Sequence, residues 1–172
     1  LIAGVLDITT TEIADECVGG VLSAGPTRLT AAAELGVPQV VCPGATDMVN
    51  FLAPETIPRS FSGRQFHAHN ANVSLMRTSA QECLKIGEDI GRKLRQAPAT
   101  TRCLFPTRGV SALDASGQPF EDKEARRALF SAWAAQATPT PCLELDMHLN
   151  DPPFAKEAVS LLDQLMNQNK HA

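Results

Sequence analysis

Short apolar segments alternate with helical segments along the whole chain, and this alternation limits the folds that the sequence can adopt. Residues 1–6, 37–44, 63–68, 101–105 and 142–147 have the composition of buried strands. Amphipathic or alanine-rich helical segments occupy residues 10–18, 26–36, 79–96, 121–136 and 152 onward. Strands that alternate with helices form parallel sheets with helices packed on their faces. We therefore predict an α/β fold, with an open, mostly parallel sheet flanked by helices on both faces as a Rossmann-like three-layer sandwich.

The remaining segments give more local expectations. Residues 21–25 fit a short strand or turn, and residues 45–63 contain prolines and no clean period, which predicts a long irregular loop. Thr9 and Glu12 form a capping-box pattern before the first helix, and Thr78 and Ser79 offer caps before the helix that begins near residue 79. Gly87 and Gly91 lie one turn apart, so this helix is expected to pack closely against the sheet.

Length, charge and cysteine content exclude several classes of protein. A chain of 172 residues with 44% hydrophobic residues is sufficient for one well-buried core. The formal net charge is −4 and the basic residues are scattered, so no nucleic-acid partner is expected. No apolar run approaches the roughly 20 residues that span a bilayer, and no signal peptide is visible, so no membrane partner is expected. The five widely spaced cysteines form no C-x-x-C pair, which favours a reducing compartment and predicts a cytoplasmic location.

The start of the chain indicates how the domain is organised. The chain begins at Leu1, without Met, inside the apolar segment L-I-A-G-V-L. Native chains rarely begin inside a secondary-structure element. We expect residues 1–172 to form a single α/β domain that belongs to a longer protein.

Polar residues follow the expected strands, where open α/β sheets bind their ligands. In such sheets the loops and helix N-termini beyond the carboxyl ends of the strands surround one crevice. The loops at the opposite ends are poorer in His, Asp and Arg. The residues predicted to bind a ligand are Thr9, Thr10, Thr11, Gly25, Gly44, Asp47, Asn50, Asn70, Arg77, Arg108, Gly109 and Ser111; His148, Asn150 and Asp151 follow the last strand.

Three residues are candidates for proton transfer. Asp7 directly follows an apolar strand and has the position of a general base, although a carboxylate there can also orient neighbouring loops. His67 and His69 lie two residues apart, so they project to the same side of a strand and could exchange protons near neutral pH. The same pair could ligate a metal with a third ligand from Asp47, Asp146 or His148. The segment contains few carboxylate or thiolate side chains, however, and we predict no metal site.

Two arginines are candidates for binding an anion. Arg77 directly precedes a capped helix, and Arg108 precedes a glycine. A guanidinium beside free main-chain N–H groups binds a carboxylate or phosphate, although for both residues a surface arginine that caps a carbonyl or pairs with Asp114 is an equal alternative. Ser23–Arg28 fits a small anion nest around Gly25, without the glycine pattern of a P-loop or a dinucleotide fold. Ser111, Asp114 and His148 have the residue types of a hydrolytic triad but lack the G-x-S-x-G elbow, which argues against hydrolysis.

Several long motifs resemble those of a known family. They are D-I-T-T-T-E-I-A-D-E-C-V-G-G, G-V-P-Q-V-V-C-P-G-A-T-D-M-V-N-F, H-N-A-N-V-S-L-M-R-T, R-G-V-S-A-L-D-A-S-G-Q-P-F and E-L-D-M-H-L-N-D-P-P-F-A. Together they resemble the second subdomain of the uncharacterised Tm-like ATP-binding family (tomato mosaic virus resistance protein-like). Ala71 stands where many members have proline, and Cys42 where serine is common, which speaks against Cys42 as an obligatory nucleophile.

The resemblance implies nucleotide binding, with ATP associated with the first subdomain of a two-subdomain protein. The expected partners are that N-terminal subdomain, a small anionic ligand and further copies of the chain in a homo-oligomer. The sequence assigns no cofactor to this chain, while ATP remains possible for the full-length protein. We predict a domain that binds an anionic metabolite or nucleotide. The alternatives are an enzyme domain acting on a phosphorylated or carboxylated metabolite, and a structural or oligomerisation domain that supports the N-terminal subdomain.

Overall fold

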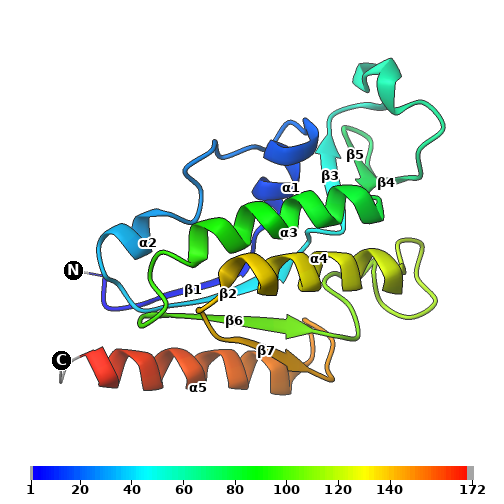
Figure 1. Ribbon diagram of the computed structural model, residues 1–172. Coiled ribbons are helices and arrows are strands. Elements are labelled where there is room, and N and C mark those ends of the chain that lie inside the picture. The colour runs from blue at the N-terminus through cyan, green and yellow to red at the C-terminus, as the bar shows by residue number, and fades with distance from the viewer. Residues whose placement is uncertain (1, 170–172) are drawn as a thin grey trace.

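A parallel four-stranded sheet forms the centre of the molecule (Figure 1). The computed structural model describes residues 2–169. The strands run in the order β1-β2-β6-β7, and every neighbouring pair is parallel. Their bounds are Val5–Thr9 (β1), Gln39–Gly44 (β2), Thr101–Pro106 (β6) and Cys142–Leu145 (β7).

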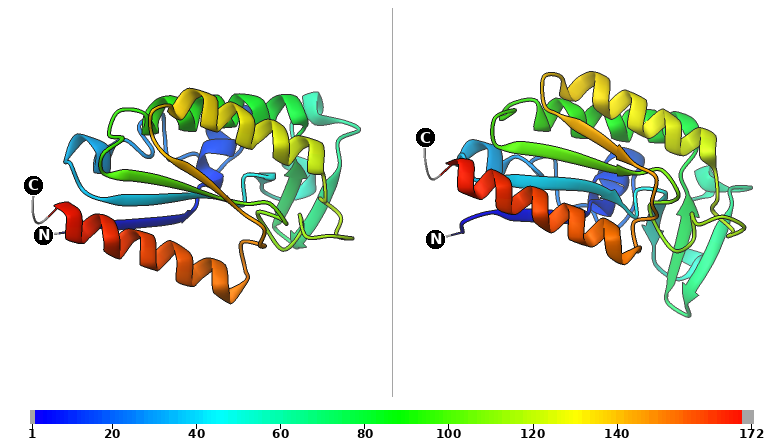
Figure 2. Two further views of the ribbon diagram at one scale, coloured as in Figure 1. Left: turned by 60° about the horizontal axis from the view of Figure 1, so that its bottom comes forward. Right: turned by 90° about the horizontal axis from the view of Figure 1, so that it is seen from below.

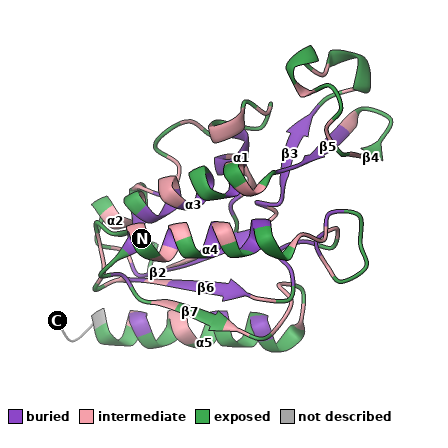
Figure 3. Cartoon of the chain, turned by 45° about the vertical axis from the view of Figure 1, so that its right-hand side comes forward, coloured by how far each residue is buried: buried purple, intermediate pink, exposed green. Residues whose placement is uncertain are grey.

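Helices cover both faces of this sheet (Figure 2). The helices α1 (Thr11–Val18), α3 (Ala80–Leu94) and α4 (Lys123–Ala137) pack on one face, and α5 (Pro152–Asn169) packs on the other. All six residues of β2 are buried, as expected for a parallel strand covered on both faces (Figure 3). The predicted α/β sandwich is therefore confirmed. In residues 2–169, no helix is long and apolar enough to cross a membrane.

The sequence of α3 accounts for its start and its buried face. Ser79 caps the helix: its hydroxyl accepts a hydrogen bond from the Glu82 N–H at 3.3 Å, and the Glu82 carboxylate accepts one from the Ser79 N–H at 2.7 Å. This capping box was predicted from the sequence. The buried stripe lies at helical spacing and comprises Cys83, Ile86, Ile90 and Leu94.

Two glycines let α3 approach α4 closely. A Cβ at Gly87 would lie 2.3 Å from the Leu129 carbonyl oxygen, and one at Gly91 would lie 2.6 Å from the Trp133 carbonyl oxygen. The close contact predicted for these glycines is thus with a neighbouring helix, whereas the sequence analysis placed it at the sheet. A regular helix–helix contact of this kind depends on the absence of a side chain at the crossing.

A second sheet replaces part of the predicted loop. The strands β3 (Met48–Phe51), β5 (Val73–Arg77) and β4 (Phe66–Asn70) form an antiparallel sheet in the order β3-β5-β4, beyond the carboxyl ends of the parallel strands (Figure 1). The irregular loop predicted for residues 45–63 is wrong where β3 forms, and the rest contains the short 3-10 turns Pro54–Thr56 and Arg59–Phe61. Four residues are too few to show a period, and β3 depends on its pairing with β5.

Three further local expectations differ from the structure in whole or in part. The helix predicted for residues 26–36 is reduced to α2 (Ala31–Glu34), which buries no residue, because an alanine-rich segment without an apolar face gains little from packing. The segment 21–25, for which a short strand or a turn was expected, forms no strand. The predicted Thr9 cap is also absent: Thr10 occupies the N-cap position of α1, and its hydroxyl donates instead to the Cys42 carbonyl at 3.1 Å.

The contact between α3 and α4 gives a first prediction. Replacing Gly87 with Ala should lower the free energy of unfolding by about 1–3 kcal/mol, because the methyl group meets a backbone carbonyl that cannot move aside alone. The cost of the clash should exceed the roughly 1 kcal/mol by which alanine stabilises a helix relative to glycine. Urea denaturation measures the change, with Lys85→Ala on the exposed side of α3 as the control. An equally or more stable Gly87→Ala protein would contradict the packing.

Candidate functional site

Backbone hydrogen bonds join the loops at the carboxyl edge of the parallel sheet. The Thr10 N–H donates to the Gly44 carbonyl, the Ala45 N–H to the Val110 carbonyl, and the Leu149 N–H to the Gly109 carbonyl, each at 3.0 Å. The loops after β1, β2, β6 and β7 are therefore linked in series. The structure thus brings the predicted residues Thr10, Gly44 and Gly109 to one edge.

Neighbouring atoms leave no room for a side chain at two glycines of these loops. A Cβ at Gly44 would lie 2.3 Å from the Ile8 carbonyl oxygen. At Gly109, φ is 144°, and a Cβ would lie 2.6 Å from the His148 ring. His148 is itself held in place, because its Nε2 lies 2.9 Å from the Ser111 carbonyl oxygen and its Nδ1 accepts from the Asn150 N–H. Both glycines are required by the loop packing, while their ligand-binding roles stay predictions.

Asp47 and Ser111 form a buried pair between two of these loops. The Ser111 hydroxyl donates to Asp47 Oδ2 at 2.7 Å and accepts from the Leu113 and Asp114 N–H groups. In residues 2–169, Asp47 Oδ1 is buried without a hydrogen-bond partner. Burial raises the pKa of Asp47 to about 6; the Ser111 hydrogen bond opposes this shift, and the charge of Asp114 adds to it.

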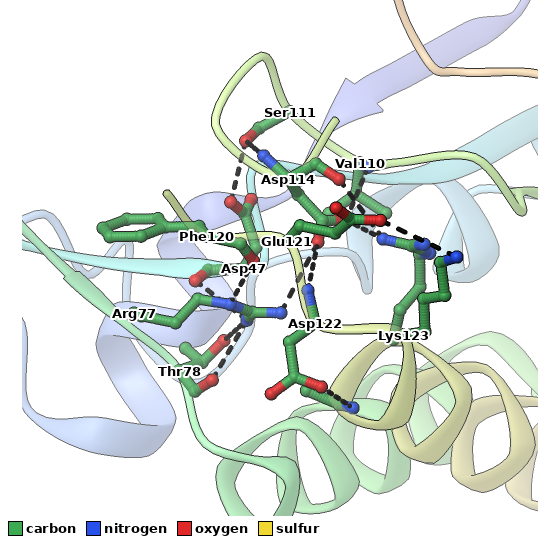
Figure 4. A network of polar contacts seen from close by, with 12 residues as sticks. Asp47, Arg77, Thr78, Val110, Ser111, Asp114, Phe120, Glu121, Asp122 and Lys123 are labelled. Atoms are coloured by element: carbon green, nitrogen blue, oxygen red, sulfur yellow. Dashed lines mark hydrogen bonds and ion pairs between the residues drawn. The ribbon is translucent and has the colours of Figure 1, made fainter. Parts of the chain in front are cut away.

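Asp114 is the centre of the surrounding network (Figure 4). Its fully buried carboxylate accepts a hydrogen bond from Arg126 Nη1 at 2.6 Å and lies 3.6 Å from Arg77 Nη2. It also accepts from the Val110 N–H at 3.1 Å and the Asp122 N–H at 3.4 Å. One side chain therefore connects β5, the loop after β6 and the start of α4. The sequence indicated Asp114 only as an alternative partner of Arg77 or Arg108, and Arg126 was not among the predicted residues.

Arg77 belongs to this network and has little freedom to bind anything else. Its guanidinium is 7% exposed. Nε donates to the Phe120 carbonyl at 2.7 Å, and Nη1 donates to the Asp47 carbonyl at 3.1 Å and the Thr78 carbonyl at 3.0 Å. An anion would have to displace these acceptors or the Asp114 carboxylate. The anion-binding role of Arg77 stays a prediction, and the structure gives the side chain a different, structural use.

The segment with the two histidines forms a tight hairpin of the small sheet. His67 lies on β4, partly buried, with its ring centre 6.2 Å from that of Phe120. His69 is exposed, and the Asn70 side chain accepts from the Asn72 N–H at 2.8 Å in the turn between β4 and β5. These residues lie outside the parallel sheet, on the strand at the edge of the small one. Their catalytic and ligand-binding roles stay predictions.

Asp7 is paired with an arginine that the sequence analysis placed in the anion nest. Arg28 donates to both carboxylate oxygens of Asp7, at 2.5 and 2.7 Å, and to the Thr9 carbonyl at 3.3 Å. This ion pair raises the pKa of Arg28. The Gly25 N–H donates to the Ser23 hydroxyl at 2.9 Å, and φ of Gly25 is 83°. The ion pair therefore joins Asp7, the predicted general base, to the segment predicted as an anion nest. This pairing limits the access of a substrate to Asp7.

Asn50 and Thr11 also take part in an internal contact. The Asn50 amide donates to the Thr11 hydroxyl at 3.2 Å and to Asp15 Oδ1 at 3.1 Å. Asp15, which the sequence analysis missed, also accepts from the main-chain N–H groups of Asn50 and Leu22, at 2.8 and 2.7 Å. Burial raises the pKa of Asp15, and these hydrogen bonds oppose the shift. A buried aspartate on α1 thus ties the segment after α1 to β3.

A pocket of about 430 Å³ lies between α4 and the carboxyl ends of β6 and β7. Its wall carries four cationic side chains and two acidic ones: Arg108, Lys123, Arg126, Arg127, Glu121 and Glu144. Arg108, which was predicted to bind an anion, is paired with Asp146 at 2.7 and 2.8 Å, and both side chains are mostly exposed. The alternative of a pairing with Asp114 holds for Arg77, which lies 3.6 Å from this carboxylate, and not for Arg108.

One stripe of α4 faces this pocket. Lys123, Arg127 and Ser131 follow each other at four-residue spacing, which places them on the same side of the helix. Lys123 lies 3.8 Å from Glu121, whereas Arg127 has no ion-pair or hydrogen-bond partner in its side chain within residues 2–169. This spacing is visible in the sequence and could have identified the pocket wall.

Comparison with known proteins gives one family and several relatives. Residues 1–166 match the model of the uncharacterised protein family (UPF0261) C-terminal domain. A UPF0261 protein of Mesorhizobium japonicum is 48% identical over 166 residues, which cover 95% of the chain and 42% of that protein. One from Clostridium tetani is 46% identical, with 96% and 41% covered. The ToMV resistance protein Tm-1(GCR237) of Solanum lycopersicum is 40% identical, with 99% and 23% covered. The chain therefore spans less than half the length of these relatives.

The buried network gives a second prediction. Replacing Asp114 with Asn should lower the free energy of unfolding by about 3–5 kcal/mol, because two buried guanidinium groups lose their charged partner. Thermal or urea denaturation measures this loss. Asp146→Asn removes the exposed carboxylate of another arginine pair and should leave the unfolding midpoint close to that of the parent. If the two replacements lower the free energy of unfolding equally, Asp114 contributes no more to stability than an exposed carboxylate does.

Asp47 gives a third prediction, on pH. Because its pKa is raised in the folded state, the folded protein holds the proton while the unfolded chain releases it, so stability falls as the pH rises from about 4 through about 6. The asparagine of Asp47→Asn has nearly the shape of a protonated aspartate and carries no charge. This variant should therefore be more stable than the parent by about 1–3 kcal/mol at pH 7. The difference should diminish below pH 4.

Urea denaturation of both proteins between pH 3.5 and 7.5 measures this difference. Asp163→Asn, at an exposed position on α5, controls for the loss of a carboxylate elsewhere. A difference between Asp47→Asn and the parent that does not change with pH would contradict the assignment of the raised pKa to Asp47.

Proposed function

We propose that this chain, which belongs to the UPF0261 family as its C-terminal domain, binds a small anionic molecule in the pocket between α4 and the ends of β6 and β7. The observation that carries the proposal is the side chain of Arg127. It lines the pocket, is exposed, and has no acidic partner in the part of the chain that the structure describes. A guanidinium in this setting can form a charge-assisted, two-pronged hydrogen bond with a phosphate or carboxylate.

The charges around Arg127 support the same ligand class. Lys123 lies one turn before Arg127 on α4, and Arg108 reaches the pocket from the loop after β6. The pocket is lined by the first turns of α4, where the helix dipole adds partial positive charge. Arg108, Arg126 and Lys123 each have an acidic neighbour, in Asp146, Asp114 and Glu121. Arg127 is thus the cation of this wall that offers an unpaired charge to an anionic ligand in the described residues.

The floor of the pocket is held rigidly. Arg126 is 6% exposed, donates from Nε to the Thr107 carbonyl at 3.1 Å, and is fixed by Asp114 from Nη1. A wall that is fixed before binding reduces the side-chain entropy that the protein loses when a ligand binds. The volume of about 430 Å³ lies within the range of small-molecule sites, and the position at the carboxyl edge is where such sheets bind ligands.

The proposal concerns binding, and the pocket supplies no assembled set of catalytic groups. The relatives extend well beyond the matched region, and we propose that the chain works beside a further subdomain of the same protein. ATP binding, the expectation taken from the resemblance, is proposed for that larger protein. The name of the tomato relative, a ToMV resistance protein, describes that protein.

A titration with inorganic phosphate tests the proposed site. Phosphate should shift the backbone amide NMR signals of Lys123, Arg127 and Ser131. Replacing Arg127 with Gln should weaken binding by about 1.5–3 kcal/mol, the range for a hydrogen bond to a charged group. Arg95→Gln, which removes an exposed arginine at the end of α3, is the matched control and should bind phosphate as the parent does. Unchanged binding in Arg127→Gln, or no binding by the parent, would refute the site.

A further inference from the structure

Glu144 lies on the side of the sheet that α4 covers. It pairs in register with Phe105 of β6, and Phe105 belongs to the core beneath α3 and α4. Residues in register on neighbouring strands point to the same face. Two residues earlier along the same strands, and so on the same face, Cys142 pairs with Cys103 and packs against this core. Glu144 therefore lies on the α4 side of the sheet, on the edge strand β7, where its side chain is exposed and lines the pocket.

The carboxylate of Glu144 is available to a ligand. In residues 2–169 it has no ion-pair or hydrogen-bond partner in its side chain, although four cationic side chains line the same pocket. Glu121, the other acid, is already engaged: it accepts from the Gly117 N–H at 2.6 Å and lies 3.8 Å from Lys123. Glu144 is thus the acid of this wall that can accept hydrogen bonds from a ligand.

An unpaired carboxylate selects among anionic ligands. It accepts hydrogen bonds from hydroxyl or ammonium groups and repels a second negative group. A dicarboxylate would place one of its charges near Glu144. A molecule with one phosphate and several hydroxyl groups avoids this conflict, because the phosphate binds the α4 cations and the hydroxyl groups donate to Glu144.

The remaining wall residues fit the same ligand. Ser116, Ser131 and Thr107 add hydroxyl groups that can donate to or accept from a ligand. The aromatic ring of the wall, Phe130, is 5% exposed and stacked on Phe105 with ring centres 4.7 Å apart. Its face is therefore occupied by the core and is not offered to a nucleobase. The polar wall favours a hydroxyl-rich ligand over a nucleotide.

We propose that the ligand of this pocket is a phosphate monoester of a sugar or polyol, with Arg127 and Lys123 at the phosphate and Glu144 at the hydroxyl groups. This inference rests on the proposed function and adds the substrate class to it. It assigns Glu144 the selection of ligands by their hydroxyl groups.

Isothermal titration with glucose 6-phosphate, inorganic phosphate and AMP tests the assignment on four proteins: the parent, Glu144→Gln, Arg127→Gln and Glu124→Gln. Glu124 lies on the first turn of α4 outside the pocket wall, so its replacement removes the same charge without the same contact. The parent should bind glucose 6-phosphate about tenfold more tightly than phosphate, as one hydrogen bond to a charged group provides. Glu144→Gln should lose this advantage and still bind phosphate, whereas Arg127→Gln should weaken both ligands.

The contrary outcomes are distinct. If the parent binds phosphate but gains nothing from the sugar, or if AMP binds more tightly than glucose 6-phosphate, the substrate class is wrong and the anion site stands. Tighter binding of both phosphates by Glu144→Gln would show that Glu144 only repels anions, and would overturn its role. If the parent binds none of the three ligands, the proposed function fails together with the inference.

Discussion

The buried carboxylate of Asp114 is the interaction on which the carboxyl edge of the sheet depends. A charge at 0% exposure is tolerated only when its hydrogen bonds and counter-charges are complete. Asp114 receives them from two arginines and from two main-chain N–H groups, and these donors come from β5, from the loop after β6 and from the start of α4. Without this carboxylate the two buried guanidinium groups would lose their charged partner, so these segments fold around it together.

The same carboxylate connects the small antiparallel sheet to the pocket. Arg77 lies on β5, whereas Arg126 lines the pocket, and both contact Asp114. Asp47 adds a second acid to the two arginines, and the charge of Asp114 contributes to its raised pKa. The number of buried cations and acids is thus balanced within the network. A shift of the hairpin would have to carry Arg77 away from Asp114 or move Asp114 relative to Arg126, which couples the position of the hairpin to one wall of the pocket.

Periodicity and capping were sufficient to predict much of the fold, and they failed where structure depends on distant partners. The buried stripe of α3 and its Ser79 cap are local signals, and both were correct. The strand β3 depends on pairing with β5, more than twenty residues later, and left no local signal. Thr10, Gly44 and Gly109 lie at the predicted carboxyl edge of the parallel sheet, whereas His67, His69 and Asn70 lie on the small sheet. The sequence did not identify Arg28 as the partner of Asp7, and it indicated Asp114 only as one alternative partner of Arg77. The stripe of Lys123, Arg127 and Ser131 was a local signal and could have been recognised.

The pocket arises from the position of β7 at the edge of the sheet. On the inner strand β6, Phe105 fills the space below α4 and stacks on Phe130, so the helix rests on an aromatic pair. On β7 the residue in register is Glu144, which cannot support the helix by apolar contact. A carboxylate here costs the packing that an apolar side chain would provide, and the cations of α4 leave it without a direct partner in the described chain. Because Glu144 is exposed on the edge strand, this position stays open to solvent, and the two sets of charges can meet through a third molecule between them.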